Sequence, residues 1–231
     1  MARRLRVASG GVAYHIINRR VGREPIFEDD GDYAAFEKVL AQAVDWCAGV
    51  RVVAYCLMPN HWHLVLWPRR DGELSRFMQW LTVTHMRRWH AHRGTAGTGP
   101  LYQGRFKSFP IQQDDHFLTV VRYVERNPLR ARLVKKAQDW AWSSFRRRGE
   151  GPNWLLPAPA WPCPQPDNWE ALVNAPLADE ALGTVRNSVN RGIPFGDPSW
   201  QRRTALKLGL QSTLRPPWRP KKQGTATPGG K

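Results

Sequence analysis

Residues 51–68, which read RVVAYCLMPNHWHLVLWP, constrain the fold more than any other stretch of the chain. They contain two short apolar runs, 51–57 and 61–67, on either side of Met58-Pro59-Asn60. Val, Tyr, Leu and Trp suit a half-buried pleated surface, and the Pro-Asn pair favours a turn. The stretch therefore predicts two β-strands joined by a turn.

The second of these strands begins with His61-Trp62-His63. Because side chains alternate between the two faces of a strand, His61 and His63 should point one way and Trp62 the other. The strand rise places the Cα atoms of the two histidines roughly 6.5 Å apart, close enough for two neutral imidazoles to bind one metal ion. Two surface histidines on an edge strand are the alternative, and a third metal ligand has to come from another part of the chain.

Helices and strands on both sides of this pair follow from the spacing of apolar residues. The predicted elements are a strand at 12–19, helices at 30–49 and 74–92, a strand at 102–111 and a helix from about 114 to 126. That last helix should end at Asn127, because the residue before a proline is pushed out of helical geometry. The order of these elements predicts an α+β fold, a ferredoxin-like antiparallel sheet with helices, over residues 9–148.

Beyond residue 148 the composition changes. Six prolines between residues 149 and 167 predict a proline-rich linker, which we assign to residues 149–178. Residues 179–214 are predicted to be a small helical, basic C-terminal extension with a helix-turn-helix-like arrangement that binds DNA. Residues 215–231 are predicted to be a disordered basic tail. Residues 184–231 hold ten Lys or Arg and one Asp, which gives this part a net charge of +9.

The charge of the whole chain indicates what it binds. Thirty-five Lys and Arg against 19 Asp and Glu give a formal net charge of +16, which favours nucleic acid first and an anionic membrane second. No apolar run approaches the roughly 20 residues of a membrane span, and the basic N-terminus lacks the apolar core of a signal peptide. Cys47, Cys56 and Cys163 show no C-x-x-C spacing, which argues against a disulfide framework and fits a cytosolic setting. A structural zinc site built from one cysteine and the two histidines stays open.

Tyr123 and Asn127 lie four residues apart in the predicted helix and therefore share one helical face. A tyrosine in a helix is most often a core residue. Four arginines crowd this region, however, and such an arrangement would lower the pKa of the phenol and hold phosphates. They are Arg122, Arg126, Arg130 and Arg132. A tyrosine beside a divalent metal and a basic surface can attack a phosphodiester, so Tyr123 is the candidate nucleophile.

Three segments, in this order and spacing, carry a resemblance to a known family. MPNHWHLVLWP, LYQGRFKSFPI and YVERNPLRARLV resemble the REP-associated tyrosine transposases, which are HUH-type single-tyrosine enzymes. The resemblance covers residues 11–148 and extends more loosely to RNSVNRGIPFG and the helix after it. It implies the HUH nuclease fold and the cleavage and rejoining of single-stranded DNA near hairpins, through a covalent 5′-phosphotyrosine intermediate and with a divalent metal.

The resemblance also implies roles for individual residues. His61 and His63 match the HUH pair, and Tyr123 matches the nucleophile. Asn127 stands where a polar third metal ligand is expected, although many relatives carry glutamine there. Two histidines and one side-chain oxygen suit Mg²⁺ or Mn²⁺, whereas zinc would prefer a closed tetrahedron. Because all four residues precede residue 139, a chain lacking residues 179–231 is expected still to form the covalent adduct at high DNA concentration.

The expected partner is single-stranded or hairpin DNA, in a cytoplasmic, nucleoid-associated setting and without a membrane, for a monomer or a homodimer. Basic residues interleaved with aromatics favour contact with nucleic acid. The residues expected to bind DNA are Arg19, Arg105, Lys107, Arg122, Arg126, Arg130, Arg202, Arg203 and Lys207. The alternative is a catalytically idle relative that binds hairpin DNA or RNA as a regulator. The presence of His61, His63 and Tyr123 together favours the enzyme, because a binding protein has no need of all three.

Overall fold

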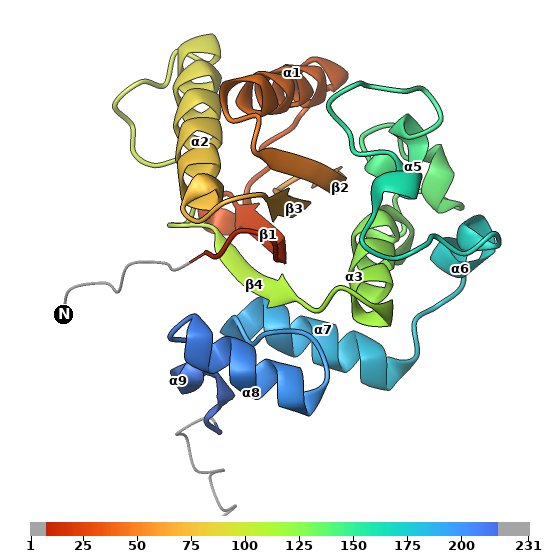
Figure 1. Ribbon diagram of the computed structural model, residues 1–231. Helices are drawn as coiled ribbons and strands as arrows, with labels where there is room; N and C mark the ends of the chain where they lie inside the picture. Colours follow the sequence, from red (N-terminus) through yellow and green to blue (C-terminus); the bar gives the residue numbers. More distant parts are fainter. Residues whose placement is uncertain (1–7, 217–231) are drawn as a thin grey trace, which may run out of the picture.

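The computed structural model describes residues 8–216, and a sheet of antiparallel strands lies at their centre (Figure 1). The strands are β1 (Ala13–Arg19), β2 (Val50–Met58), β3 (His61–Pro68) and β4 (Lys107–Ile111), in the order β2-β3-β1-β4. Between them come α1 (Asp30–Trp46), after β1, and α2 (Glu73–His92), after β3. The predicted α+β fold with an antiparallel sheet is confirmed.

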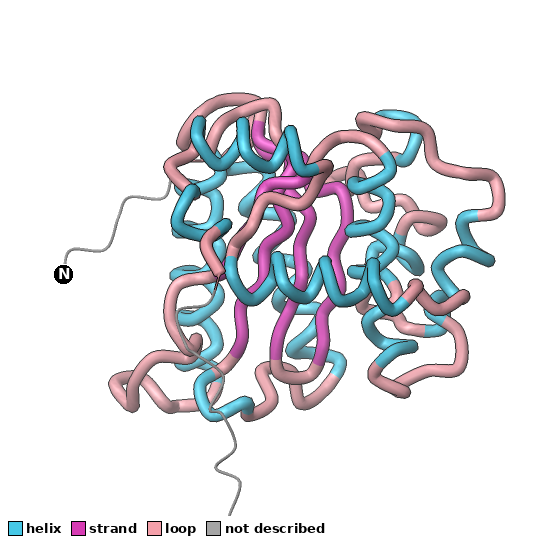
Figure 2. Tube along the Cα trace, turned by 90° about the horizontal axis from the view of Figure 1, so that it is seen from below, coloured by secondary structure: helices cyan, strands magenta, loops and turns pink. Residues whose placement is uncertain are grey.

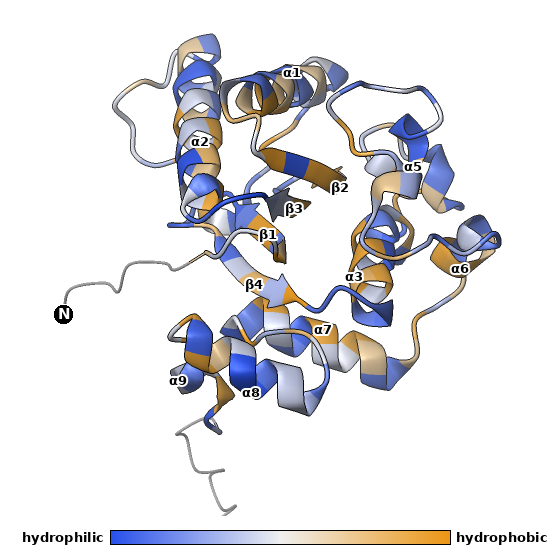
Figure 3. Ribbon diagram, in the orientation of Figure 1, coloured by the Kyte–Doolittle hydropathy of each residue, from blue (hydrophilic) through white to orange (hydrophobic). Residues whose placement is uncertain are grey.

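The strand β3 separates two hydrophobic layers. Trp62 and Leu64 belong to the core that β3 shares with α1 and α2, whereas Val65 belongs to the core beneath α3 (Asp115–Glu125). His63 contacts Tyr123 of α3, so it lies on the face opposite to Trp62, as the alternation predicted. β2 is mostly hydrophobic in Figure 3, apart from a hydrophilic band, which fits a strand that helices cover on both faces.

The helix ends follow local chemistry. The side chain of Asp29 accepts a hydrogen bond from the backbone N–H of Asp32 at the start of α1, and Asp114 does the same for His116 at the start of α3. α3 ends at Glu125, and a separate short helix, α4 (Asn127–Arg130), begins before Pro128. A break therefore occurs close to the predicted position, but α3 ends two residues earlier than expected, and Asn127, the residue before the proline, is helical.

Two predicted boundaries are wrong. α1 ends at Trp46 rather than at residue 49, because Cys47 leaves helical geometry. The strand predicted at 102–111 begins only at Lys107: Tyr102 forms an isolated bridge with Arg20, and Gly104 takes a φ of 147° that interrupts the extended chain.

The segment after α4 wraps around the outside of α3. It contains η2 (Ala137–Asp139), α5 (Ser144–Arg147), η3 (Ala158–Ala160) and α6 (Trp169–Asn174). The fully buried carboxylate of Glu125, in α3, holds this segment, residues 131–174, which we call the wrap. It accepts hydrogen bonds from Arg148, from the hydroxyl of Ser144 and from the indole N–H of Trp169, at 2.7, 2.8 and 2.9 Å.

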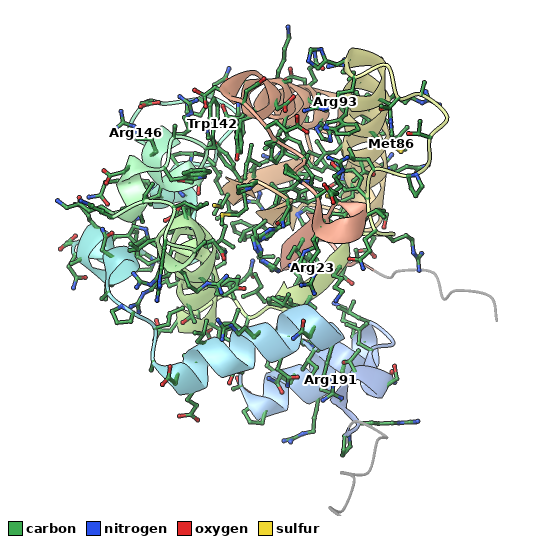
Figure 4. All side chains as sticks on the ribbon, turned by 180° about the vertical axis from the view of Figure 1, so that it is seen from behind. Arg23, Met86, Arg93, Trp142, Arg146 and Arg191 are labelled. Atoms are coloured by element: carbon green, nitrogen blue, oxygen red, sulfur yellow. The ribbon has the colours of Figure 1, made fainter. Side chains whose placement is uncertain are left out.

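The C-terminal helices are α7 (Asp179–Arg191), α8 (Pro198–Lys207) and α9 (Gln211–Leu214). α7 contacts β4 and α3, and it lies across the sheet when the molecule is seen from below (Figure 2). Figure 4 shows side chains in the space between α7 and the sheet. Val185 of α7 is fully buried, and Phe195 exchanges backbone hydrogen bonds of 2.9 Å with Pro110 and Gln112 at the end of β4.

The helices expected within 179–214 are present, but their division from residues 9–148 as a separate domain stays a prediction. The tail predicted at 215–231 lies, apart from its first two residues, outside the described part of the chain. Within residues 8–216, no helix is long and apolar enough to cross a membrane. The short 3-10 helix η1 (Val21–Arg23) follows β1.

Candidate active site

A cavity of about 250 Å³ lies between the sheet, α3 and α7. It brings together His61 and His63 of β3 with Tyr123 of α3, which are far apart in the sequence. The other residues that line it are Ile17, Arg19, Arg130, Arg186, Val189 and Asn190. Five of these nine residues were expected from the sequence to act in catalysis, metal binding or DNA binding.

Strand pairing brings the basic and imidazole side chains to one face. β1 pairs with β3 so that Arg19 lies opposite His61 and Ile17 lies opposite His63. The imidazole centroids of His61 and His63 are 5.1 Å apart, and the ring of Tyr123 lies 5.8 Å from that of His63. The candidate nucleophile and the candidate metal ligands are therefore neighbours.

The turn residue Asn60 fixes the tautomer of His61. The amide nitrogen of Asn60 donates to the carbonyl of Arg23 at 3.0 Å, which leaves its oxygen facing the imidazole. His61 Nδ1–H donates to this oxygen at 2.6 Å, so Nε2 carries the free electron pair. Burial lowers the pKa of His61 to about 4, and the charges of Arg19 and Arg130 act in the same direction. His61 is therefore neutral near pH 7, as a metal ligand must be.

His63 is buried more deeply. Its Nδ1 lies 2.8 Å from Nε2 of His15 on β1, and its own Nε2 is buried without a hydrogen-bond partner. Burial holds the pKa of His63 well below its usual range, with smaller contributions from the charges of neighbouring groups. His15 is itself fully buried, and burial lowers its pKa to about 3. Sequence reasoning missed His15, because a single histidine in an apolar strand carries no signal of its partner.

Tyr123 is buried beneath the arginines of the site. Burial raises the pKa of its phenol, and the charges of Arg130, Arg186 and Arg19 oppose this shift only in part. The guanidinium of Arg130 lies 5.4 Å from the centre of the Tyr123 ring. The expectation that neighbouring arginines lower the phenol pKa is therefore wrong in its net direction, because loss of hydration outweighs them.

Comparison with known proteins identifies the family. The family described as "Transposase IS200 like" matches residues 8–127, just over half of the chain, including His61, His63, Tyr123 and Asn127. The chain belongs to the IS200-like transposases. Its role is therefore in DNA transposition, with DNA binding and DNA recombination. None of the curated proteins matches the chain.

One solved structure supports the fold of this transposase. A REP-associated tyrosine transposase bound to a REP hairpin is similar with a TM-score of 0.52 and 21% identity, over 68% of this chain and 88% of that chain. A candidate transposase from Deinococcus radiodurans R1 gives a TM-score of 0.38 and 18% identity, over 54% of this chain and 96% of that chain. The first likeness agrees with the fold expected from the sequence motifs.

Asn127 of the transposase lies next to the cavity but does not line it. Its amide nitrogen donates to the carbonyl of Tyr123 at 3.0 Å, and its oxygen accepts a hydrogen bond from Arg130. A role as the third metal ligand stays a prediction, and it would require this oxygen to leave Arg130. Within residues 8–216, no group of three His, Cys, Asp or Glu side chains is arranged to hold a metal ion.

Arg122 and Arg126 do not line the cavity. The guanidinium of Arg122 donates to the carbonyls of Ala175 and Pro176, at 2.9 and 3.0 Å, and that of Arg126 donates to the carbonyls of Val173 and Asn174. These carbonyls lie at the C-terminal end of α6, where a cation is favourable. In this structure both arginines hold the wrap onto α3, so DNA contact by either one stays a prediction.

The other predicted DNA-binding residues lie in two places. Arg105 and Lys107 line a second cavity of about 360 Å³. The two cavities share Ile17, Arg19, Val189 and Asn190. Arg202, Arg203 and Lys207 are exposed on α8 and do not line the candidate active site. Arg186 and Asn190, which reach the site from α7, were not singled out from the sequence, although their segment, 179–214, was expected to bind DNA.

Proposed function

We propose that this transposase cleaves and rejoins single-stranded DNA at hairpin sequences, with Tyr123 as the nucleophile and a divalent metal ion bound by His61 and His63. One observation carries the proposal: the phenol and the imidazole pair meet in a single cavity, with 5.8 Å between the ring centroids of Tyr123 and His63. A similar fold has been solved with a REP hairpin bound, which supports hairpin DNA as the substrate class.

The imidazole pair fits a divalent ion. His61 presents an unprotonated Nε2, and the buried Nε2 of His63 has no partner within the protein. Two nitrogens leave several coordination positions for water and phosphate oxygens, which suits Mg²⁺ or Mn²⁺. Such an ion supplies positive charge to the scissile phosphate when it is bound. Asn127 could add a side-chain oxygen if DNA drew Arg130 away from it.

Three guanidinium groups would hold the phosphate. Arg19, Arg130 and Arg186 line the cavity from β1, α4 and α7. Among the described residues, the side chains of Arg19 and Arg186 have no hydrogen-bond or ion-pair partner. Free guanidinium groups bind phosphate oxygens through charge-assisted hydrogen bonds, so these two are available to the DNA backbone.

The cleavage step conserves atoms and charge. The phenol oxygen of Tyr123 attacks the phosphorus, the bond from phosphorus to the 3′ oxygen breaks, and a 5′-phosphotyrosine ester forms. The phenol proton is transferred, overall, to the leaving 3′ oxygen, which is released as a 3′ hydroxyl. Because burial raises the pKa of Tyr123, this proton is still present at neutral pH and must leave as the attack proceeds. Attack by another 3′ hydroxyl on the phosphotyrosine reverses the step and joins two ends.

The test is a covalent adduct between protein and DNA. The full-length protein, incubated with a single-stranded hairpin and Mn²⁺, should give a band on a denaturing gel that Tyr123→Phe abolishes. Hairpin binding should remain nearly unchanged, because phosphate contacts by Lys and Arg dominate affinity. Tyr14→Phe is the matched control, since Tyr14 is buried on the opposite face of the sheet and should keep the adduct.

Three results would count against the proposal. Adduct formation by the Tyr123→Phe protein at the wild-type rate would remove Tyr123 as the nucleophile. Hairpin binding by the wild-type protein without any adduct would favour the idle regulator. Equal cleavage of blunt duplex and hairpin would contradict the substrate class, because a continuous duplex holds its phosphates away from a buried tyrosine.

A further inference from the structure

Two buried imidazoles, those of His15 and His63, contact each other beneath the candidate active site. His15 Nε2 lies 2.8 Å from His63 Nδ1. β1 and β3 pair so that His15 lies opposite Val65, two residues beyond His63 on the same face. The ring of Phe109, from β4, stacks on His15 with 4.9 Å between centroids and an interplanar angle of 29°. His15 is therefore held in a fixed position behind His63.

A single proton lies between the two rings, and its position decides whether His63 can bind a metal ion. If His63 Nδ1–H donates to His15 Nε2, then His63 Nε2 carries a free electron pair. If His15 Nε2–H donates instead, then His63 Nε2 carries the proton and cannot act as a ligand. In either arrangement, two buried nitrogens, His15 Nδ1 and His63 Nε2, have no partner. One of them carries a proton and the other an electron pair. The protein alone therefore gives neither arrangement more hydrogen bonds than the other.

A bound metal ion would favour the first arrangement, because the electron pair on His63 Nε2 would then have a partner. His61 provides a parallel. Its Nδ1–H is held by the oxygen of Asn60, and its Nε2 is free. Metal-binding histidines usually donate their other ring N–H to an acceptor that fixes the tautomer and orients the ring. For His63 the described structure offers one such acceptor, His15.

We propose that His15 is a positioning residue for the metal site: its Nε2 accepts the Nδ1–H of His63 and thereby presents His63 Nε2 to the ion. This inference rests on the proposed metal pair of His61 and His63. It assigns a role to a residue of β1 that does not touch the DNA or the ion. Removal of the acceptor would leave a buried N–H on His63 without a partner in the metal-binding tautomer, which should weaken metal binding.

The experiment measures metal affinity, so it does not depend on DNA cleavage. Mn²⁺ is titrated calorimetrically into the full-length wild-type protein and into the His15→Leu, His15→Gln and His63→Ala variants. His15→Leu should weaken Mn²⁺ binding by about 10- to 100-fold. His15→Gln should stay within a few-fold of wild type, because its amide oxygen can reach the position of Nε2. His85→Leu is the matched control: it removes a buried imidazole from the opposite layer and should leave Mn²⁺ binding unchanged.

The possible results distinguish failure of the role of His15 from failure of the proposed metal pair. Unchanged Mn²⁺ binding by His63→Ala would overturn the metal pair itself. If His63→Ala loses Mn²⁺ binding while His15→Leu binds as wild type does, only the role of His15 is overturned. Equal losses of affinity for His15→Leu and His15→Gln would overturn that role as well. If His15→Leu does not fold, long-range ¹H–¹⁵N spectra of the wild-type protein with Mg²⁺ decide the question. They should show His63 with its proton on Nδ1, and a proton on Nε2 would overturn the inference.

Discussion

Mild acid should destabilise this protein strongly, because the fold holds several histidines neutral. His15 and His85 are buried, and burial lowers the pKa of each to about 3, while an unfolded histidine titrates near 6.5. Around His85, the charge of Asp32 raises the pKa and that of Arg93 lowers it, both by less than burial does. Between pH 6.5 and the folded pKa the unfolded state binds more protons, so stability falls as the pH falls.

The size of the effect follows from linkage. At about one pH unit below the unfolded pKa, each imidazole that stays neutral in the folded state costs about 1.4 kcal/mol of unfolding free energy. His15 and His85 together should therefore cost about 3 kcal/mol between pH 7.5 and pH 5.5. His61, whose pKa is lowered to about 4, and His63, whose pKa is well below its usual range, add to the loss in the same direction. Such a loss is a large part of the roughly 5–15 kcal/mol that stabilises an ordinary domain.

Urea unfolding at the two pH values, followed by tryptophan fluorescence in EDTA, measures this loss. The His85→Gln protein is the sharpest comparison, because His85 lies between α1 and α2, away from the metal ligands. It should lose about 1.4 kcal/mol less than wild type over the same pH interval. The pKa of Asp32 is lowered, so this carboxylate stays ionised throughout and does not contribute. Equal unfolding free energies at both pH values would refute the reasoning.

Two further predictions concern the active site and the C-terminal helices. His61→Ala should lower Mn²⁺ affinity and adduct formation together, by at least about tenfold, and EDTA should abolish the wild-type adduct; activity that survives exhaustive chelation would contradict the metal pair. Removal of residues 179–231 should weaken hairpin binding and flatten the slope of log affinity against log salt by several units, because residues 184–231 hold ten Lys or Arg. An unchanged slope, measured by fluorescence anisotropy at several salt concentrations, would show that the extension does not touch DNA.

Much of the fold could be predicted from the sequence because its signals are local. The turn at Met58-Pro59-Asn60, the caps of α1 and α3 and the break at Pro128 each depend on a few neighbouring residues. The alternation along β3 likewise fixed which side chains share a face. This is why the imidazole pair and Tyr123 were found without the structure, although the roles assigned to them stay predictions.

The parts that could not be predicted depend on contacts between distant segments. His15 becomes a partner of His63 only through the register of β1 against β3. Arg122 and Arg126 look like phosphate ligands in the sequence, but the end of α6, about fifty residues later, provides carbonyls that occupy both guanidinium groups. The local sequence of α3 does not indicate that backbone carbonyls bind these guanidinium groups in place of phosphate.

The placement of α7 changes how the C-terminal extension should act. Arg186, Val189 and Asn190 share one helical face and line the cavity, while Val185 is buried. The backbone hydrogen bonds between Phe195 and the end of β4 hold the chain just after α7 against the sheet. The sequence-based expectation that a chain without residues 179–231 still forms the adduct at high DNA concentration stays a prediction, to which the structure adds an expected change in rate. Loss of α7 opens one wall of the cavity and removes a guanidinium beside Tyr123, so adduct formation should slow even when the hairpin is saturating.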